Sequence, residues 1–598
     1  MRSRFIVLRL LVLVPAIFYL AALSFATGPY PVRVQRDVSI KMRDGVILRG
    51  DIFRPDADGK FPVLLERTPY RKAPWGYDID FAQRAAARGY VVFIQDVRGR
   101  YTSDGDWYPF LHESEDGYDT IEWIALQPYS NGKVGMFGGS YVGATQMLAA
   151  IAHPPHLTGI CPVVTASNYH DGWTYQGGAF EQLFNESWTS GFAPDTLAHQ
   201  VERLPHSKED LNALPLTSYP LLSLDPPGVV NVSTSSIAPY FLDWLAHPSY
   251  DDYWKRWSIE EHYGDIRVPA LHIAAWYDIF LGGSLRNYVG MRSGAATEEA
   301  RQGQRLLVLI GGHSGSGRRI GDIDFGAEAE KVDENDITLR WYDFLFKGVQ
   351  NEFASGKRVK IFVMGINQWR EEDDWPLARA KTTKYFLHSQ GSANSSRGNG
   401  SLSTSAPTSE TADKFLYVPA KPVPTTGGPL CCDGYYHLAP GPRDQGTVED
   451  RDDVLVYSTP PLDHDLEVTG PVHLDLFASS AAVETDFTAK LVDVLPDGTS
   501  FNLTEGILRA QYRDSQAQAK PLRPGQIYPL SIDLWATSNV FRKGHRIRLE
   551  ISSSNYPRFD RNLNTSELAA TSAKWATATN TILHDTAHPS ALLLPILP

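Results

Sequence analysis

A serine lies where the sequence changes from a strand-like to a helix-like pattern. An apolar run at 134–137 leads into Gly138 and Gly139, then Ser140, and a segment of small and apolar residues follows. A strand that enters a helix through such a tight turn exposes the serine hydroxyl and directs the next backbone N–H toward a developing oxyanion. The strict pattern is Gly-x-Ser-x-Gly, and here the second glycine comes one position later, at Gly143. Glycine-rich strand ends also occur as plain packing turns, but the strand–turn–helix context favours Ser140 as a nucleophile.

Two later residues could activate this serine, one as its base and one as the acid that orients the base. The apolar run at 269–277 ends at Asp278, and the run at 306–312 ends at His313. Both follow the carboxyl ends of expected strands, where open α/β sheets place their sites. Alone, the aspartate would more often be a turn residue and the histidine a surface residue. In the order serine, acid, histidine they predict a catalytic triad with Ser140.

The elements that must position these residues alternate between strand and helix from about 38 to 346. Apolar runs at 62–66 and 89–94 are typical of strands buried on both faces of a mostly parallel sheet. Helix-like segments lie between the strands, at 80–88 and 117–126. This alternation predicts an α/β domain.

Two segments break the alternation. The segment 168–262 is rich in aromatic residues and has no clear parallel strand, so we expect a largely helical cap inserted in the core. After about 357, short strands separated by Pro, Gly and Asp turns predict a sandwich or jelly roll of about 200 residues. We therefore expect the core to comprise 28–167 and 263–356, with the cap between them and a β domain at 357–598.

Residues 1–26 form a separate segment. Arg2 and Arg4 precede an almost wholly apolar stretch at 5–23, and Ser24 and Ala26 supply small residues at a cleavage site. This pattern predicts a secretory signal peptide and a periplasmic or secreted protein. The alternative is an uncleaved N-terminal anchor, which would be the chain's only contact with a membrane.

The composition excludes several functional classes. The 598 residues carry 56 Lys+Arg against 69 Asp+Glu, a net charge of −13, which argues against nucleic acid as a partner. Three cysteines exclude a disulfide framework and a four-cysteine zinc site. Cys161 is expected to be a buried thiol, whereas Cys431 and Cys432 are neighbours that could form a bridge after export or remain two thiols. No metal-binding motif is present, so we expect neither metal nor cofactor. The oligomeric state stays open, a homodimer included.

Taken together, the motifs resemble those of one hydrolase family. Ser140 in Gly-Gly-Ser-Tyr-Val-Gly, Asp278 in Trp-Tyr-Asp, and His313 resemble the triad of the cocaine-esterase and X-prolyl dipeptidyl peptidase-like hydrolases. The resemblance implies an α/β-hydrolase core, an inserted helical cap and a C-terminal galactose-binding-like jelly roll. Further motifs that resemble the family's extend the similarity over nearly the whole mature chain, at 96–105, 118–123, 131–135, 365–369 and 441–457.

The resemblance also implies an oxyanion hole formed partly by a tyrosine hydroxyl. The matching residue is Tyr70, and the backbone N–H of Tyr141 would be the second donor. The chain departs from the commoner family pattern just before His313, where Gly311 and Gly312 replace a proline and a tryptophan. Aromatic residues of the cap and of the strand end at 278 are expected to line the substrate pocket, namely Trp173, Phe180, Trp188, Trp276 and Phe280.

These observations predict a serine hydrolase that cleaves a small-molecule ester, an amide or a peptide through an acyl-enzyme. An X-Pro dipeptidyl peptidase would also need an acid for the free N-terminus, and Glu181 or Glu186 in the cap could serve. Related amino-ester hydrolases have a carboxylate cluster directly after the triad aspartate, where this chain has Ile279 and Phe280. An alternative of another class is a carbohydrate- or surface-binding protein with an inactive hydrolase core.

Overall fold

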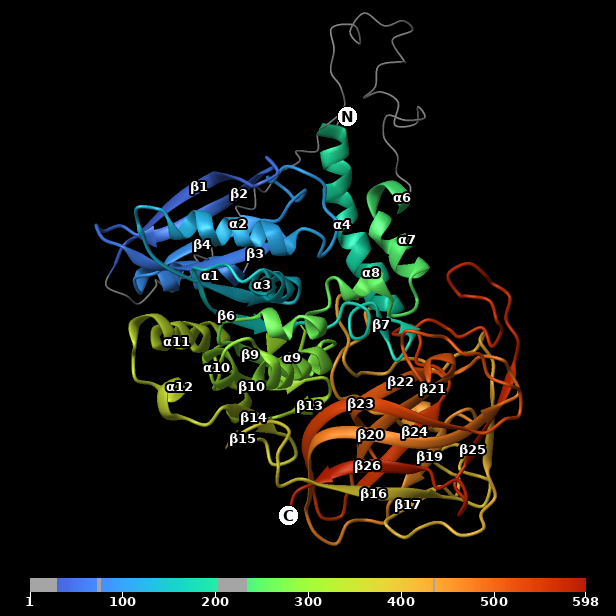
Figure 1. Cartoon of the computed structure of the whole chain (residues 1–598). Coiled ribbons are helices and arrows are strands. Elements are labelled where there is room, and N and C mark those ends of the chain that lie inside the picture. The colour runs from blue at the N-terminus through green and yellow to red at the C-terminus, as the bar shows by residue number, and fades with distance from the viewer. Residues whose placement is uncertain (1–29, 73–76, 203–233, 314, 434–435) are drawn as a thin grey trace, which may run out of the picture.

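The computed structural model describes residues 30–72, 77–202, 234–313, 315–433 and 436–598 (Figure 1). The expected signal peptide at 1–26 lies outside the described residues, and so does the cap segment 203–233. Among the described residues, no helix is both long and apolar enough to cross a membrane.

A large mixed sheet organises the first part of the chain. Its central strands, from β4 to β14, run parallel, and antiparallel strands extend it at both edges. In spatial order the strands are β1 (Val32–Lys41), β2 (Ile47–Pro55), β4 (Val91–Asp96), β3 (Phe61–Thr68), β5 (Ser130–Gly139), β6 (Leu157–Val163), β9 (Leu271–Tyr277), β10 (Arg305–Gly312), β14 (Val359–Val363) and β15 (Gln368–Glu372), with the short β11 (Gly315–Ser316) paired to β10.

Helices cover both faces of this sheet because its central strands are apolar on both sides. On one face, Phe81 of α1 and Trp341 of α11 pack with strand residues such as Leu64. On the other face, Ile121 of α2 and Met147 of α3 share a core with the cap. The helices of this part are α1 (Tyr77–Ala87), α2 (Glu113–Ala125), α3 (Tyr141–Ile151), α9 (Leu281–Gly294), α10 (Glu298–Gln302), α11 (Glu334–Lys347) and α12 (Glu352–Ser355), and small elements between α10 and α12 are β12 (Arg319–Ile320), β13 (Ile323–Asp324) and η4 (Ala327–Glu330). The predicted α/β class is confirmed.

The segment between β6 and β9 is mostly helical and stands beside the first sheet, next to the C-terminal part (Figure 1). Most of its aromatic rings are buried, including Trp173, Trp244 and Trp254, so they chiefly form core. Its described elements are β7 (Tyr175–Gln176), β8 (Ala179–Phe180), α4 (Gln182–Glu202), α6 (Thr234–Ile237), α7 (Pro239–Ala246), α8 (Asp252–Lys255), η2 (Ile259–Glu261) and η3 (Tyr263–Asp265).

The C-terminal part is all-β, as predicted, and its strands pair almost entirely antiparallel. Strands β20 and β23 form its longest ladder. The elements are β16 (Lys381–His388), β17 (Ser401–Ser403), β18 (Asp413–Tyr417), α13 (Gly446–Glu449), β19 (Leu455–Ser458), β20 (Leu466–Ser480), β21 (Asp486–Val494), β22 (Ser500–Arg509), η5 (Ala510–Tyr512), β23 (Tyr528–Phe541), β24 (Arg546–Ser552), β25 (Ala578–Leu583) and β26 (Ala591–Ile596).

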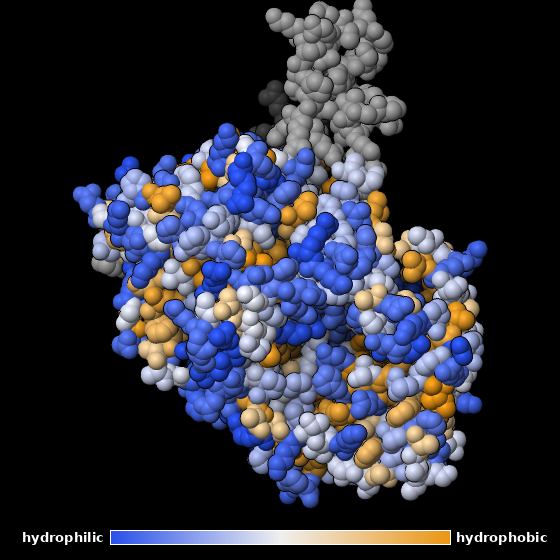
Figure 2. Space-filling view, viewed as in Figure 1, coloured by the Kyte–Doolittle hydropathy of each residue, from blue (hydrophilic) through white to orange (hydrophobic). Residues whose placement is uncertain are grey.

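The junction between the two sheets differs from the expected boundary at 357. Strands β14 and β15 follow this position, yet they pair with the first sheet. Backbone hydrogen bonds from Met364 to Ser538 and from Val540 to Met364, both 2.9 Å, then join the end of β14 to β23. One hydrophobic core continues across this junction. In the space-filling view, a hollow lies between the α/β part and the β domain on a mostly hydrophilic face (Figure 2).

Candidate active site

Ser140 occupies the turn between β5 and α3, with φ 62° and ψ −128°. A positive φ is strained for a residue with a side chain, and such strain is typical of functional turns. The turn closes only because its neighbours are small. A Cβ on Gly138 would lie 2.4 Å from the Val142 side chain, and one on Gly143 would lie 2.7 Å from Thr165. The displaced glycine of the motif therefore has a packing role against the loop after β6.

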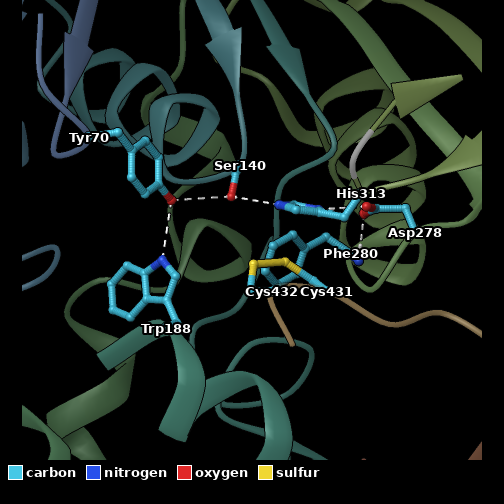
Figure 3. Close-up of a disulfide and its surroundings, with 8 residues drawn as sticks. All are labelled: Tyr70, Ser140, Trp188, Asp278, Phe280, His313, Cys431 and Cys432. Atoms are coloured by element: carbon cyan, nitrogen blue, oxygen red, sulfur yellow. Dashed lines mark hydrogen bonds and ion pairs between the residues drawn. A yellow bond between two sulfur atoms is a disulfide. The ribbon is translucent and has the colours of Figure 1, made fainter. Parts of the chain in front are cut away.

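His313 lies between the serine and the predicted acid (Figure 3). Its Nε2 is 2.9 Å from Ser140 Oγ, and its Nδ1 is 2.6 Å from Asp278 Oδ2. The other carboxylate oxygen, Oδ1, accepts the backbone N–H of Phe280 at 2.7 Å. Asp278 is fully buried, and an ionised carboxylate can only accept. Nδ1 therefore donates to Asp278, which leaves the lone pair of Nε2 directed at the Ser140 hydroxyl.

The strand order explains this meeting of residues 173 positions apart. Strands β9 and β10 are parallel neighbours, and Tyr277 at the end of one is paired with Gly312 at the end of the other. Asp278 follows Tyr277 directly, and His313 follows Gly312 directly. Because parallel strands end at the same edge of a sheet, the two side chains meet beside the turn that follows β5.

Tyr70 faces Ser140 from the side opposite His313 (Figure 3). Its hydroxyl lies 3.5 Å from Ser140 Oγ and accepts the indole N–H of Trp188 at 3.2 Å. Burial of the hydroxyl raises the pKa of Tyr70, although hydrogen bonds with Ser140, Trp188 and the backbone N–H of Tyr141 oppose this shift. The phenol therefore stays protonated, and its proton remains available as a donor near Ser140.

A buried ionic network backs the serine turn. The side chain of Tyr141 is buried, donates to Glu113 at 2.9 Å and accepts the backbone N–H of Phe110 at 2.8 Å. Glu113 also pairs with Arg67 at 2.7 Å, and Arg67 is wholly buried. Burial raises the pKa of Glu113, and the charge of Arg67 opposes that rise. This network, which sequence reasoning missed, ties α2 and α3 to the strand that leads to Tyr70.

Three of the five predicted pocket aromatics lie around the triad. Trp173 stacks on Phe280 with ring centres 4.6 Å apart, and the Phe280 ring meets His313 edge-on at 5.2 Å. Trp188 contacts Tyr70, as described above. Trp173 and Phe280 are fully buried, so they support the His313 side of the site from behind.

The structure does not bring the other two, Trp276 and Phe180, to the serine. The Trp276 indole donates to the backbone oxygen of Phe362 in β14 at 2.7 Å and packs on Trp375, so it is a core residue. Phe180 packs between Tyr175 and Phe241 in the interface of the cap with the β domain. Successive side chains of a strand face opposite sides, and the buried indole N–H of Trp276 lies on the side where the Phe362 carbonyl accepts it.

Neither candidate acid for a substrate N-terminus lies beside Ser140. Glu181 is 1% exposed, lies 3.6 Å from Arg558, and shares that guanidinium with Glu505. Glu186 accepts from Gln182 and lines a separate cavity of about 440 Å³ between the cap and the β domain. Both side chains belong to the interface between these two parts.

A cavity of about 490 Å³ opens at Ser140 and His313. Its walls include Phe81 of α1, Phe137 of β5 and Glu334 of α11. Burial raises the pKa of Glu334, whose carboxylate accepts from Ser316 at 3.4 Å. Sequence reasoning missed Phe81 and Glu334 because α1 and α11 reach the site only through the packing of the sheet.

The adjacent cysteines also lie at the site. Cys431 and Cys432 form a disulfide, the first of the two alternatives that the sequence left open. A nitrogen of His313 and the two sulfur atoms all lie within 4.8 Å of one another (Figure 3). Cys161 is a free, buried thiol in β6, as predicted. The Cys-Cys pair was visible in the sequence, but nothing local indicated that it would reach His313.

Comparisons with known proteins agree with this architecture. The family model described as X-Pro dipeptidyl-peptidase (S15 family) matches residues 44–315, and that of the X-Pro dipeptidyl-peptidase C-terminal non-catalytic domain matches 351–593. A cocaine esterase from Rhodococcus sp. is 39% identical and aligns over 94% of this chain and 98% of its own.

Two solved structures share the whole fold. An aminopeptidase from a marine sediment archaeon, Thaumarchaeota, has a TM-score of 0.78 at 25% identity and covers 96% of this chain and 97% of its own. An α-amino acid ester hydrolase has a TM-score of 0.76 at 25% identity and covers 98% of this chain and 100% of its own.

An α/β sheet with a serine turn at a strand end and a C-terminal all-β domain defines a class of serine hydrolases. The chain belongs to the cocaine esterase and X-Pro dipeptidyl-peptidase family, and it is a hydrolase that acts on ester or peptide bonds. The family resemblance and the fold predicted from the sequence are thereby confirmed.

Burial of Glu181 predicts a pH-dependent stability. Burial raises its pKa to about 7, and the charge of Arg558, which Glu181 shares with Glu505, opposes this rise only in part. Between pH 5 and 7 the folded state then keeps a proton that the unfolded state, with a pKa near 4.3, releases, so stability falls as the pH rises. We expect Glu181→Gln to remove up to about 1.4 kcal/mol of this loss per pH unit, measured by urea unfolding across that window.

Asp324→Asn is the control for this experiment. Hydrogen bonds from Arg318 and from the backbone of Gly326 lower the pKa of Asp324 to about 2, so it is ionised in both states throughout the window. Its replacement should leave unchanged the slope of the free energy of unfolding against pH. An equal slope in Glu181→Gln and the parent chain would contradict the protonated carboxyl.

Proposed function

We propose that the protein is an exported esterase that cleaves carboxylic esters through an acyl-enzyme on Ser140. The observation that carries the proposal is the hydrogen-bonded row from buried Asp278 through His313 to Ser140, with the Tyr70 hydroxyl on the opposite side. This row supplies a nucleophile, a base and an acid that orients the base.

Acylation begins when His313 Nε2 takes the proton of Ser140, whose oxygen attacks the ester carbonyl. The negative charge of Asp278 stabilises the imidazolium and keeps Nδ1 protonated, without accepting the proton itself. The Tyr70 hydroxyl and the Tyr141 N–H stabilise the oxyanion, each contributing about 3 kcal/mol when well placed. His313 then returns the proton to the leaving alkoxide as the carbon–oxygen bond breaks.

Deacylation repeats these steps with water as the nucleophile. His313 deprotonates the water, the same two donors hold the second oxyanion, and the proton returns to Ser140 as the acid product leaves. The surrounding aromatic rings, chiefly Trp188 with Trp173 and Phe280 behind, favour an acyl group that is bulky and hydrophobic.

Ester hydrolysis ranks above X-Pro dipeptide cleavage. A dipeptidyl peptidase must hold a substrate ammonium, and the two acids considered for that task, Glu181 and Glu186, lie in the interface of the cap with the β domain. The positions after Asp278 hold Ile279 and Phe280, both fully buried, in place of the carboxylates of amino-ester hydrolases. The name of the 39% identical relative, a cocaine esterase, supports an ester substrate.

Loss of the nucleophile should abolish turnover. We expect Ser140→Ala to reduce kcat for a p-nitrophenyl ester by about 10⁴-fold or more, because the proposed acyl-enzyme forms on the Ser140 oxygen. Labelling by a fluorophosphonate probe should disappear with the same substitution. A parent chain that the probe does not label would support the alternative of a binding protein with an inactive core.

Removal of one oxyanion donor should slow the chemistry and leave the nucleophile intact. Tyr70→Phe keeps the ring and removes the hydroxyl, so we expect kcat to fall about 100-fold with little change in KM. Tyr385→Phe, in β16 of the β domain, serves as the matched control and should keep the parent kcat. Equal rates for Tyr70→Phe and the parent chain would remove Tyr70 from the mechanism.

Export is proposed from residues 1–26 alone. Cleavage after Ala26 would give a mature chain that begins at Thr27. N-terminal sequencing of the protein from the periplasm or the medium tests this, and retention of the Arg2–Arg4 segment on a membrane-bound protein would indicate the anchor instead.

A further inference from the structure

The loop that carries the disulfide comes from the β domain, between β18 and α13. Two backbone hydrogen bonds close its base, from Gly428 N to Gly441 O at 2.8 Å and from Gly441 N to Gly428 O at 2.9 Å. Cys431 is buried and belongs to the same hydrophobic cluster as Trp188 and Phe280, whereas Cys432 is exposed. The loop therefore places one sulfur against the aromatic side of the site and leaves the other open to small reagents.

The positions of the sulfur atoms have a chemical consequence for His313. The two sulfurs and a ring nitrogen of His313 lie within 4.8 Å of one another. Zinc binds thiolate at about 2.3 Å and imidazole nitrogen at about 2.0 Å, so one ion could bridge three atoms so placed after a small adjustment. Sulfur atoms joined in a disulfide are not thiolates, and the oxidised site therefore offers only the histidine.

We propose that the Cys431–Cys432 bridge controls inhibition of the active site through its redox state. Its reduction creates a His–Cys–Cys site for a thiophilic divalent cation such as Zn²⁺, and the bound cation withdraws His313 from catalysis. The metal site stands on the geometry of the three residues, while the inhibition rests on the proposed function.

Reduction uses two equivalents of a small thiol. The first thiolate attacks the exposed sulfur of Cys432, breaks the S–S bond, and gives a mixed disulfide and a Cys431 thiol after protonation. The second thiolate attacks the small-molecule sulfur of the mixed disulfide and frees Cys432, with release of the oxidised reagent as its own disulfide. The protein gains two electrons and two protons in total.

Metal binding then competes directly with the base. Two thiolates form as two protons leave, and the ion takes the lone pair of His313. Since Nδ1 donates to Asp278, the lone pair on the neutral ring is that of Nε2, which would otherwise accept the Ser140 proton. The Asp278–His313–metal arrangement is the carboxylate–histidine–metal geometry that usually strengthens a histidine ligand.

Cobalt provides a test that does not depend on turnover. Denatured, unreduced mature chain should titrate one thiol, that of Cys161, and reduced chain should titrate three. After reduction and removal of the reductant, Co²⁺ should produce a thiolate-to-cobalt charge-transfer absorption that the oxidised protein lacks. His313→Ala should weaken Co²⁺ binding by about tenfold or more.

The cysteine variants separate this site from the third thiol. The double variant of Cys431→Ser and Cys432→Ser should lose the charge-transfer absorption. If the double variant does not fold, Cys432→Ser alone, at an exposed position, replaces it in this test. Cys161→Ala is the matched control and should keep the absorption. No absorption in the reduced parent chain, or an affinity for Co²⁺ that His313→Ala leaves unchanged, would overturn the metal site.

Inhibition is measured separately with Zn²⁺ and the p-nitrophenyl ester. The reduced enzyme should be inhibited at a Zn²⁺ concentration about tenfold or more below that needed for the oxidised enzyme. If the reduced enzyme binds Co²⁺ but needs as much Zn²⁺ for inhibition as the oxidised enzyme, the proposed inhibition is overturned and the metal site is retained. A chain without turnover under any condition would contradict the proposed function, and the cobalt spectrum would still decide the metal site.

Discussion

The hydrogen bond between Asp278 and His313 is the interaction on which the site depends. A carboxylate buried this deeply is stable only when its oxygens are satisfied, and here one accepts from the ring of His313 and the other from a backbone N–H. The parallel pairing of β9 with β10 supplies the geometry, because it ends both strands at one edge of the sheet. Because His313 Nδ1 donates its proton to Asp278, the lone pair of Nε2 is the one directed at Ser140.

All three parts of the chain contribute to the site around this pair. The first sheet supplies Ser140, Asp278 and His313, the cap supplies Trp188, and the β domain supplies the Cys431–Cys432 loop. Each of the latter two approaches the reactive atoms from a different direction (Figure 3). The β domain therefore contributes to the wall of the candidate site and also packs against the core.

Buried charges hold these parts in register. The Arg67–Glu113 pair fixes the turn that carries Ser140 against α2, and the Arg558 guanidinium joins Glu181 of the cap to Glu505 of β22. Removal of Glu113 would deprive the buried Arg67 charge of its nearest carboxylate, which is strongly destabilising in a protein interior. The Arg67–Glu113 pair lies within the core, whereas the contacts of Arg558 join the cap to the β domain.

The sequence by itself determined the α/β class, the all-β C-terminal part, and Ser140, Asp278 and His313 as candidates. These features are local: strand periodicity, a small-residue turn, and polar residues at strand ends are written within a few positions of one another. The tertiary structure decided which aromatic side chains reach the site, selecting Trp188 and not Trp276, and it added β14 and β15 to the first sheet. It also brought Cys431 and Cys432 to His313 and paired Glu181 with Arg558. The contacts of Trp188 with Tyr70, of the cysteines with His313 and of Glu181 with Arg558 join residues separated by more than a hundred positions. All of these contacts depend on how the faces of whole elements pack, which no local pattern encodes.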